Sequence, residues 1–236
     1  MTTAYSSRGE LLSATLPSGT SIIYDHDPMG KRIAKRVNGT ITEKYLWKDP
    51  ITLLAVYDAS DNLLMRFKYA DGRMPVSMTY SGSTYYLTYN QIGSLKAVTD
   101  IVGNLVKKID YDSFGSIISD TNPTMNIPFG FAGGLHDRDN GLVRFGACDY
   151  DPSIERWTAK DPIDFAGGDT NLYGYMANDP VNYRKLGTAP IYCDNDFRFL
   201  TIKLKTNPCS SKPFCKISAN CNVYFYLINS VCTCTL

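Results

Sequence analysis

The sequence predicts a mainly β protein, in which a wound antiparallel sheet of hairpin repeats is closed by a turn-rich segment with one or two short helices. Three observations support this class. Tyrosine is abundant, at 17 of 236 residues, and aromatic side chains pack well on a pleated sheet. Tyrosines recur at a regular spacing between residues 24 and 119. Gly, Pro, Asp and Asn dipeptides crowd residues 128–183, which indicates tight turns between short strands.

Composition excludes several other classes. With 44% hydrophobic residues and a net charge of +1, the chain is neither disordered nor strongly charged, so charge gives no support for a nucleic acid partner. No run reaches the roughly 18 apolar residues that a membrane span needs. The first residues, MTTAYSSRGELL, lack the basic and then apolar order of a signal peptide. We therefore expect any export to follow another route.

The repeats begin near residue 24, after a partial strand region at 1–23. Their tyrosines are spaced 21, 24, 20 and 22 residues apart, and several are followed by a glycine: Tyr24, Tyr45, Tyr69, Tyr89 and Tyr111, with Gly30, Gly72, Gly93 and Gly115. A period near 20 residues indicates an array of supersecondary units, none of which buries its face alone. We expect the tyrosine rings to stack from one unit onto the next.

Each unit is predicted to be a β-hairpin. Runs of β-forming residues at 40–47, 63–69 and 85–89 follow the dipeptides Asn38-Gly39, Asp61-Asn62 and Ser81-Gly82. Asn-Gly is the strongest short hairpin pattern, because both residues adopt positive φ readily. The tyrosines and the Asp or Asn residues beside them are therefore interpreted as strand and turn residues without chemistry of their own.

The segment at 128–187 is different in character. It holds short aromatic and aliphatic runs between the turns Gly133-Gly134, Asp139-Asn140-Gly141, Asp151-Pro152, Asp161-Pro162, Gly167-Gly168 and Asp179-Pro180. Two short helices are expected within it. Asn171 can cap residues 172–177 before Pro180 ends the helix, and Pro162 can open a single turn.

This segment resembles the Rhs repeat-associated core, which ends the shell of Rhs and YD-repeat proteins in bacteria. The resemblance rests on Phe129-Gly130, Gly141-Leu142, Cys148-Asp149-Tyr150-Asp151-Pro152, Glu155-Arg156-Trp157, Asp161-Pro162-Ile163, Asn171-Leu172-Tyr173-Gly174-Tyr175 and Asn178-Asp179-Pro180. The tyrosine repeats at 24–127 are similar to YD repeats. Together they imply a β-shell that encloses a variable C-terminal tip, here residues 188–236, for delivery into neighbouring cells.

The resemblance also implies partners and a location. Upstream YD repeats of a longer chain are expected to complete the shell, with an export apparatus and an immunity protein as further partners. The protein is expected to be cytoplasmic before export, and then secreted or held at the cell surface. Two other functions stay open: a carbohydrate-binding module whose tyrosine-rich sheet faces stack on glycans, and a self-cleaving core that carries a toxic tip.

Self-cleavage is the main catalytic hypothesis, and it too comes from the resemblance. Cores of this family carry an aspartyl-type site of one Arg and two Asp residues. Asp161 matches the first carboxylate, but Cys148 stands at the Arg position and Lys185, or its neighbour Arg184, at the second Asp. A lone carboxylate beside a cation cannot share a proton with a second carboxylate, so we expect no cleavage. Glu155 replaces a Gly and is expected to be strained if φ is positive there.

The tail at 188–236 contains six of the seven cysteines: Cys193, Cys209, Cys215, Cys221, Cys232 and Cys234. Zinc sites favour close pairs such as Cys-x2-Cys, whereas the intervening stretches here are 15, 5, 5, 10 and 1 residues long. We therefore predict no metal site. A set of disulfides and a shifted reading frame that produces cysteines by chance both remain open.

Other chemistry finds little support. Asp137, Asp139 and Gly141 begin like a calcium loop, but the closing Glu would fall at Cys148, so a turn before a strand at 141–145 is the better interpretation. His26 and His136 are expected to be exposed turn residues, without a Ser or Cys nucleophile in a recognisable motif. No phosphate-binding glycine loop is present, and we predict no cofactor.

Overall fold

The computed structural model describes residues 1–49, 51–70, 74–146, 148–160, 171–176 and 180, and the tail strands at 215–216, 224–228 and 231–235. The chain divides into two compact units, Met1–Phe197 and Arg198–Leu236. The second unit contains a three-stranded antiparallel sheet of β17 (Cys215–Lys216), β18 (Tyr224–Ile228) and β19 (Val231–Thr235). Among the described residues, the structure has no helix of the length and apolarity that a bilayer crossing requires.

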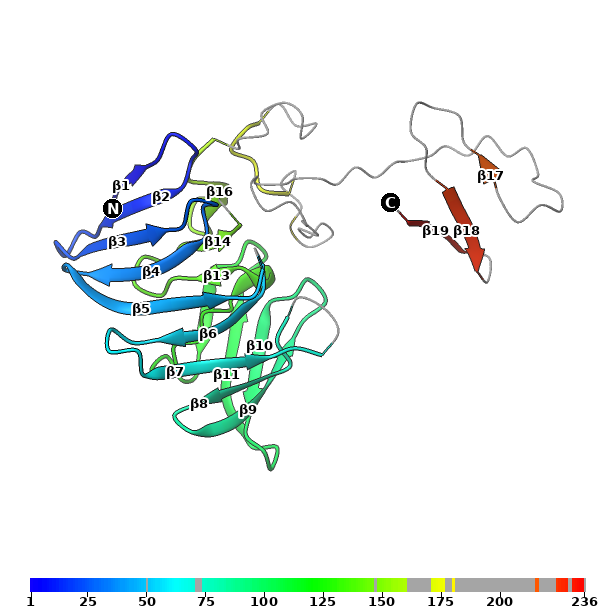
Figure 1. The fold of residues 1–236 in the computed structure, drawn as a ribbon, viewed down its shortest axis with the longest axis horizontal. Coiled ribbons are helices and arrows are strands. Elements are labelled where there is room, and N and C mark those ends of the chain that lie inside the picture. Colours follow the sequence, from blue (N-terminus) through cyan, green and yellow to red (C-terminus); the bar gives the residue numbers. More distant parts are fainter. Residues whose placement is uncertain are drawn as a thin grey trace. The chain divides into compact units, whose positions relative to one another are not determined.

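The first unit is built on a twelve-stranded antiparallel sheet, in which each strand pairs with its neighbours in sequence. The strands are β1 (Thr2–Tyr5), β2 (Leu11–Thr15), β3 (Ser21–His26), β4 (Arg32–Val37), β5 (Thr40–Trp47), β6 (Leu53–Tyr57), β7 (Leu63–Lys68), β8 (Ser77–Tyr80), β9 (Ser83–Tyr89), β10 (Leu95–Thr99), β11 (Leu105–Tyr111) and β12 (Ile117–Asp120). Figure 1 shows successive strands side by side in the order of the sequence, with β10 and β11 behind β6 and β7 in this view. The predicted wound sheet is confirmed, and it is open, with β1 and β12 as its edges.

Asp side chains close the repeat turns in a common way. Asp58 Oδ1 accepts hydrogen bonds from the backbone N–H groups of Ser60 and Asn62, at 2.9 and 2.8 Å. The same bonding to the second and fourth following residues recurs at Asp27, Asp100 and Asp112. Such side-chain bonding mimics a backbone turn, which explains the Asp in the repeats. The first repeat uses Asp27 for this role, whereas Asp25 pairs with Arg36 at 2.9 Å.

The expected stacking of repeat tyrosines is wrong. None of the ring contacts within the described residues joins two of the five repeat tyrosines. Instead, the Tyr69 hydroxyl donates to the Leu53 carbonyl at 2.7 Å, and the Tyr89 hydroxyl to the Pro75 carbonyl at 3.0 Å. These tyrosines therefore connect strands through their hydroxyl groups, because buried hydroxyls need a partner.

The segment after the large sheet forms a second, four-stranded sheet. Its strands are β13 (Leu135–His136), β14 (Val143–Phe145), β15 (Cys148–Asp151) and β16 (Arg156–Trp157), preceded by a 3-10 turn at Phe131–Gly133. Five rings form its core, with neighbouring centroids 4.1 to 6.4 Å apart: Phe131, Phe145, Tyr150, Trp157 and Tyr175. Each ring is at least nine-tenths buried, so this cluster supplies the apolar core that the short strands need.

The second sheet and its leading loop pack on the large sheet. Phe129 meets Phe67 of β7 edge to face, with centroids 5.0 Å apart. The Leu95 N–H donates to the Gly130 carbonyl at 3.2 Å, and the Tyr150 hydroxyl donates to the Phe114 carbonyl at 2.8 Å. Both apolar and backbone contacts therefore join the repeats to the segment that follows them.

Two local predictions have different outcomes. Glu155 has φ of 61°, the positive value at which strain was expected. Residues 172–175 of the helix expected at 172–177 form a turn instead, in which Gly174 N–H donates to the Asn171 carbonyl and Gly174 bridges to Arg156, and only Met176 of the described part has 3-10 helical geometry. Tyr175, on this turn, packs into the aromatic core. The turn expected at Pro162 lies outside the described residues.

Candidate functional site

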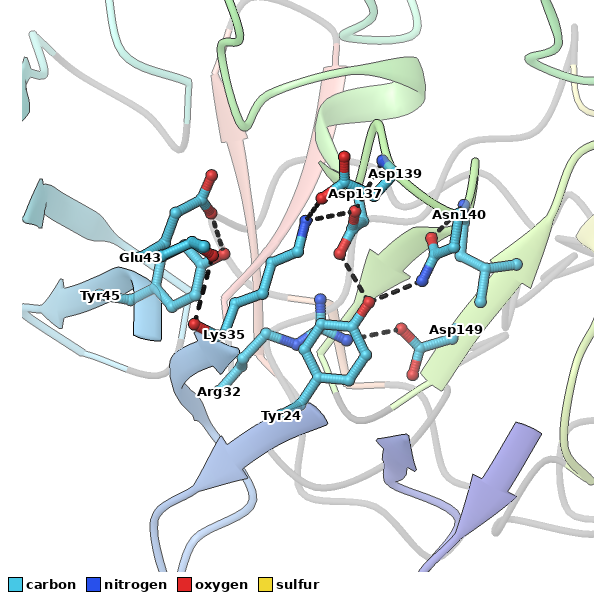
Figure 2. A network of polar contacts seen from close by, with 11 residues as sticks. Tyr24, Arg32, Lys35, Glu43, Tyr45, Asp137, Asp139, Asn140 and Asp149 are labelled. Atoms are coloured by element: carbon cyan, nitrogen blue, oxygen red, sulfur yellow. Dashed lines mark hydrogen bonds and ion pairs between the residues drawn. The ribbon is translucent and has the colours of Figure 1, made fainter. Parts of the chain in front are cut away.

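A network of charged side chains, buried at its centre and exposed at Asp139, lies where β3, β4 and β5 meet the loop and strands of the second sheet. Its members come from two parts of the chain more than 90 residues apart: Tyr24, Arg32, Lys35, Glu43 and Tyr45 from the repeats, and Asp137, Asp139, Asn140, Arg144 and Asp149 from the later segment. Figure 2 labels all of them except Arg144. Burying charge costs free energy unless the charges are paired, so the buried members of this network need partners of opposite charge.

Lys35 is the centre of the first half of the network. Its ammonium Nζ lies 2.7 Å from Asp137 Oδ1 and 2.5 Å from Asp139 Oδ2, and Figure 2 shows it between the two carboxylates. The Lys35 side chain is only 3% exposed. Burial lowers the pKa of Lys35, but the nearby carboxylates of Asp137, Asp139 and Glu43 together outweigh burial, and the net shift is upward. The pair therefore stays ionised.

Tyr24 connects this pair to the next turn. Its hydroxyl donates to Asp137 Oδ2 at 2.6 Å and accepts from Asn140 Nδ2 at 2.6 Å. Burial raises the pKa of Asp137, but the charges of Lys35 and Arg32, together with the hydrogen bonds from Lys35 and Tyr24, outweigh it and lower the pKa overall. Burial also raises the pKa of Tyr24. Tyr24 is thus a neutral donor to an ionised carboxylate.

Arg32 and Arg144 form the second half, around Asp149. Arg32 Nη2 lies 3.1 Å from Asp149 Oδ1, and Arg144 Nη1 lies 2.8 Å from Oδ2. Arg144 Nη2 also donates to the Gly30 carbonyl at 3.0 Å, and the Arg32 guanidinium lies over the Tyr24 ring at 3.6 Å from its centroid. All three charged side chains are at most 3% exposed. This triad spans β4, β14 and β15 and so joins the large sheet to the second sheet.

The loop at Asp137 is a turn, and the Lys35 ammonium pairs with its carboxylates. Gly141 N–H donates to the Asp137 carbonyl at 2.8 Å, Gly141 has φ of 77°, and strand β14 follows, as the interpretation of this loop as a turn predicts. Within the described residues no group of three or more His, Cys, Asp or Glu side chains is arranged to hold a metal ion. The Lys35 ammonium bonds the two carboxylates that a calcium loop would supply.

Neither histidine is an exposed turn residue, which corrects the sequence-based expectation: His136 is buried in β13, and His26 is half-buried at the end of β3. His136 is 8% exposed, and neither ring nitrogen of the half-buried His26 has a hydrogen-bond partner among the described residues. Burial, followed by the charges of Arg144 and Arg32, lowers the pKa of His26 to about 3. Burial and Arg138 lower the pKa of His136 to about 4. Both rings are therefore neutral near pH 7.

His136 also lines a cavity of about 20 Å³ beside the network. Arg32 and Arg138 line it as well. His136 Nδ1, Arg32 Nε, and Arg138 Nε and Nη2 are buried without a protein hydrogen-bond partner among the described residues. This volume has room for about one water molecule, whose oxygen accepts two such N–H groups. It is too small for an organic substrate.

The residues predicted for self-cleavage are only partly described. Cys148 lies in β15, is 5% exposed and is disulfide-bonded, so no cationic side chain occupies this position. Asp161 and Lys185 lie outside the described residues, as do the side chains of the tail cysteines. The hypothesis that the core cannot cleave itself therefore stays a prediction.

Sequence patterns did not predict the four charged residues that organise the network: Arg32, Lys35, Arg144 and Asp149. Two patterns could have revealed them. Arg144 stands alone within the apolar run of 142–145, and Lys35 pairs in register with Tyr24 on one face of the sheet. A charge on a predicted core face requires a counter-charge, but its position in sequence cannot be read from the strand itself.

The chain is similar in sequence to one protein family model and to several known proteins. Residues 2–181 match the family model described as the teneurin YD-shell. The sequence is 31% identical to teneurin-3 of Danio rerio over 193 residues, covering 75% of this chain and 7% of that protein. It is 29% identical to the tRNA3(Ser)-specific nuclease WapA of Bacillus spizizenii over 163 residues, covering 67% of this chain and 7% of that protein. The chain thus spans about 7% of the length of these relatives.

Solved structures agree at the level of the fold. A crystal structure of TcdB2-TccC3 superposes with a TM-score of 0.61 and 21% identity, covering 78% of this chain and 10% of that chain. A crystal structure of TcdB2-TccC3 without its hypervariable C-terminal region has a TM-score of 0.61 and 20% identity over the same shares. At these identities the likeness shows a common fold.

Proposed function

The chain belongs to the teneurin YD-shell family, whose model covers residues 2–181, and we therefore propose that it forms the end of the shell and the core plug of a longer Rhs-type toxin. One relative is by name a tRNA3(Ser)-specific nuclease, and one solved structure with the same fold is by its title part of the Photorhabdus luminescens Tc holotoxin pore. The shell would enclose a C-terminal tip and present it for delivery into competing cells. On this proposal the protein is exported to the cell surface or beyond.

One observation carries the proposal. The second sheet (β13–β16) with its loops, which would be the plug, is bonded to the large sheet, which would be the shell wall, by buried ion pairs as well as by apolar contacts. Lys35 with Asp137, and Arg32 with Asp149, both join the sheet to the later segment. Ion pairs of this kind specify one register, because breaking either leaves an uncompensated buried charge. A plug held in one register suits an enclosure better than it suits a surface that adapts to ligands.

The open sheet supports a further shell segment as partner. β1 pairs only with β2 among the described strands, so its other edge presents unpaired backbone groups. Open edges pair with other strands. We propose that upstream YD repeats of a longer chain pair with β1, and that the division into repeats at 24–127, core at 128–187 and tip at 188–236 describes how the parts work.

The test is association with a separately expressed YD-repeat segment from the same genome. Light scattering coupled to gel filtration should show self-association of the chain alone and a stoichiometric complex with the repeats. Ala4→Lys places a charge on the exposed edge position of β1 and should weaken both. Ala59→Lys, at an exposed turn, is the matched control and should weaken neither.

The opposite outcome would favour another function. If the chain is monomeric, forms no complex with the YD-repeat segment and binds glycans on an array, it is a carbohydrate-binding module. Exposed tyrosines such as Tyr86 and Tyr173, at 50% and 45% exposure, are the rings on which a sugar would stack. Loss of glycan binding in Tyr86→Ala with an unchanged fold would then identify that face.

A further inference from the structure

The outer face of the large sheet carries a groove across β5, β6 and β7. Leu46 pairs with Ala55, and Ala55 pairs with Arg66, so these three residues lie in one row. Met65 and Phe67, on either side of Arg66, belong to the buried core. Because side chains alternate along a strand, Arg66 and Lys68 point away from that core and toward the groove.

The groove has a volume of about 290 Å³, and its lining is mainly apolar. Leu46, Ala55, Tyr57, Leu63, Arg66 and Lys68 are among the residues that form it. Leu46 and Leu63 are each 47% exposed, whereas Ala55 is 3% exposed. Ala55 lies between Leu46 and Arg66 in this row and forms the floor of the groove. Its size is near the lower limit of ligand pockets.

Charge distinguishes this groove from an ordinary apolar strip. No Asp or Glu of the described chain lines it. Neither Arg66 nor Lys68 forms an ion pair with any described residue, whereas nearby Lys44 is paired with Asp61 at 2.7 Å. An apolar hollow beside two unpaired cations is complementary to an apolar group that carries a negative charge.

These features favour a peptide over a sugar or a lipid surface. A sugar site needs several polar side chains that bond to hydroxyl groups, and the lining of this groove offers Tyr57 with two cations. A membrane surface requires a broad cationic face, whereas here two cations flank a hollow of limited volume. A guanidinium such as that of Arg66 binds carboxylates with two parallel hydrogen bonds.

We propose that this groove is a docking site for a short acidic peptide segment of a partner protein, in which a large apolar side chain stands next to Asp or Glu. The apolar side chain enters the hollow above Ala55 between Leu46 and Leu63. The neighbouring carboxylate pairs with Arg66, with Lys68 as the second cation. The site lies on the face of the sheet opposite the buried core, so its use does not require the plug to move.

Fluorescence anisotropy tests this with a labelled synthetic peptide of sequence GDFDG and the full chain. Binding should weaken as salt increases, because the charges are exposed. Arg66→Ala and Leu46→Ser should each weaken it by about tenfold or more. Arg156→Ala, at an exposed arginine outside the groove, should leave it unchanged. Circular dichroism checks that each variant is folded.

Two altered peptides separate the contributions. Replacing Phe with Ser removes the apolar anchor, and replacing both Asp with Asn removes the charge, and each should bind at least about tenfold more weakly. Absence of binding at up to about 1 mM peptide, or equal binding by the folded Arg66→Ala and wild-type chains, overturns the proposal. Binding to anionic vesicles without binding to the peptide also overturns it and assigns the face to a membrane surface.

Discussion

Lys35 Nζ lies 2.7 Å from Asp137 Oδ1, although 102 residues separate them in the chain. This contact joins the second strand of a repeat hairpin to the turn that begins strand β14. Because both side chains are nearly inaccessible to water, the contact stabilises the protein only while both members are present. The contact between the large sheet and the segment after it therefore depends on single side chains that can be mutated.

Lys35→Met should destabilise the fold by about 3–5 kcal/mol, because Asp137 is left as a buried charge without its main partner. Chemical denaturation monitored by tryptophan fluorescence measures this. Lys44→Met, which breaks the more exposed pair with Asp61, is the control and should cost at most about 1 kcal/mol. Equal effects in the two variants would contradict a structural role for the buried pair.

The protein should lose stability in mild acid. The unfolded histidines titrate near 6.5, whereas His26 and His136 have pKa values of about 3 and 4 in the fold. Between these values the unfolded chain binds more protons, so the free energy of unfolding falls as the pH decreases from about 7 to 4.5. His136→Gln should reduce this fall by roughly 1–3 kcal/mol.

Urea unfolding at pH 7.5, 6 and 4.5 measures this dependence. The Asp137 carboxylate is not a competing cause in this range, because its pKa is lowered in the fold and its contribution is lost only in stronger acid. An unchanged pH dependence in His136→Gln would show that His136 is not responsible.

Two glycines in consecutive repeats separate backbone strain from packing. Gly103 and Gly115 have φ of 91° and 93°, but a methyl group on Gly115 would lie 2.3 Å from Cγ of the buried Phe131, whereas nothing lies within 4 Å at Gly103. Gly103→Ala should cost about 1–2 kcal/mol from the positive φ alone. Gly115→Ala should cost roughly 1–3 kcal/mol more.

Thermal and urea unfolding of the two variants provide the comparison. If Gly115→Ala were no worse than Gly103→Ala, the plug would not contact the last repeat turn as the structure shows. A larger loss for Gly115→Ala would confirm that the repeat turn and the aromatic core pack as one body.

The chain should remain intact after expression, because two of the three residues expected for self-cleavage are replaced, at Cys148 and Lys185. Mass spectrometry should show a single species with the mass of all 236 residues after prolonged incubation. A stable fragment that ends near Gly187 would contradict this, and its loss in Asp161→Asn would assign the cleavage to that carboxylate.

The sheet and its turns follow from the amino-acid sequence alone, because they depend on neighbouring residues. Asn38-Gly39 fixes a hairpin locally, and an Asp such as Asp58 closes its turn with its own side chain. The motifs at 129–175 likewise indicated the family, since their residues stand close together in the chain. The prediction went wrong where burial decides: His136 looked like a turn residue, yet it is covered by segments distant in sequence.

Which charges are partners depends instead on the tertiary structure. Lys35 could face water from its strand, and Asp137 could have bound calcium in its loop. Neither strand pattern nor turn motif specifies a contact across 102 residues, because pairing of buried charges depends on how two separately formed sheets pack. The large sheet and the second sheet thus form from local sequence as separate elements, and the packing of one on the other determines which buried ion pairs join them.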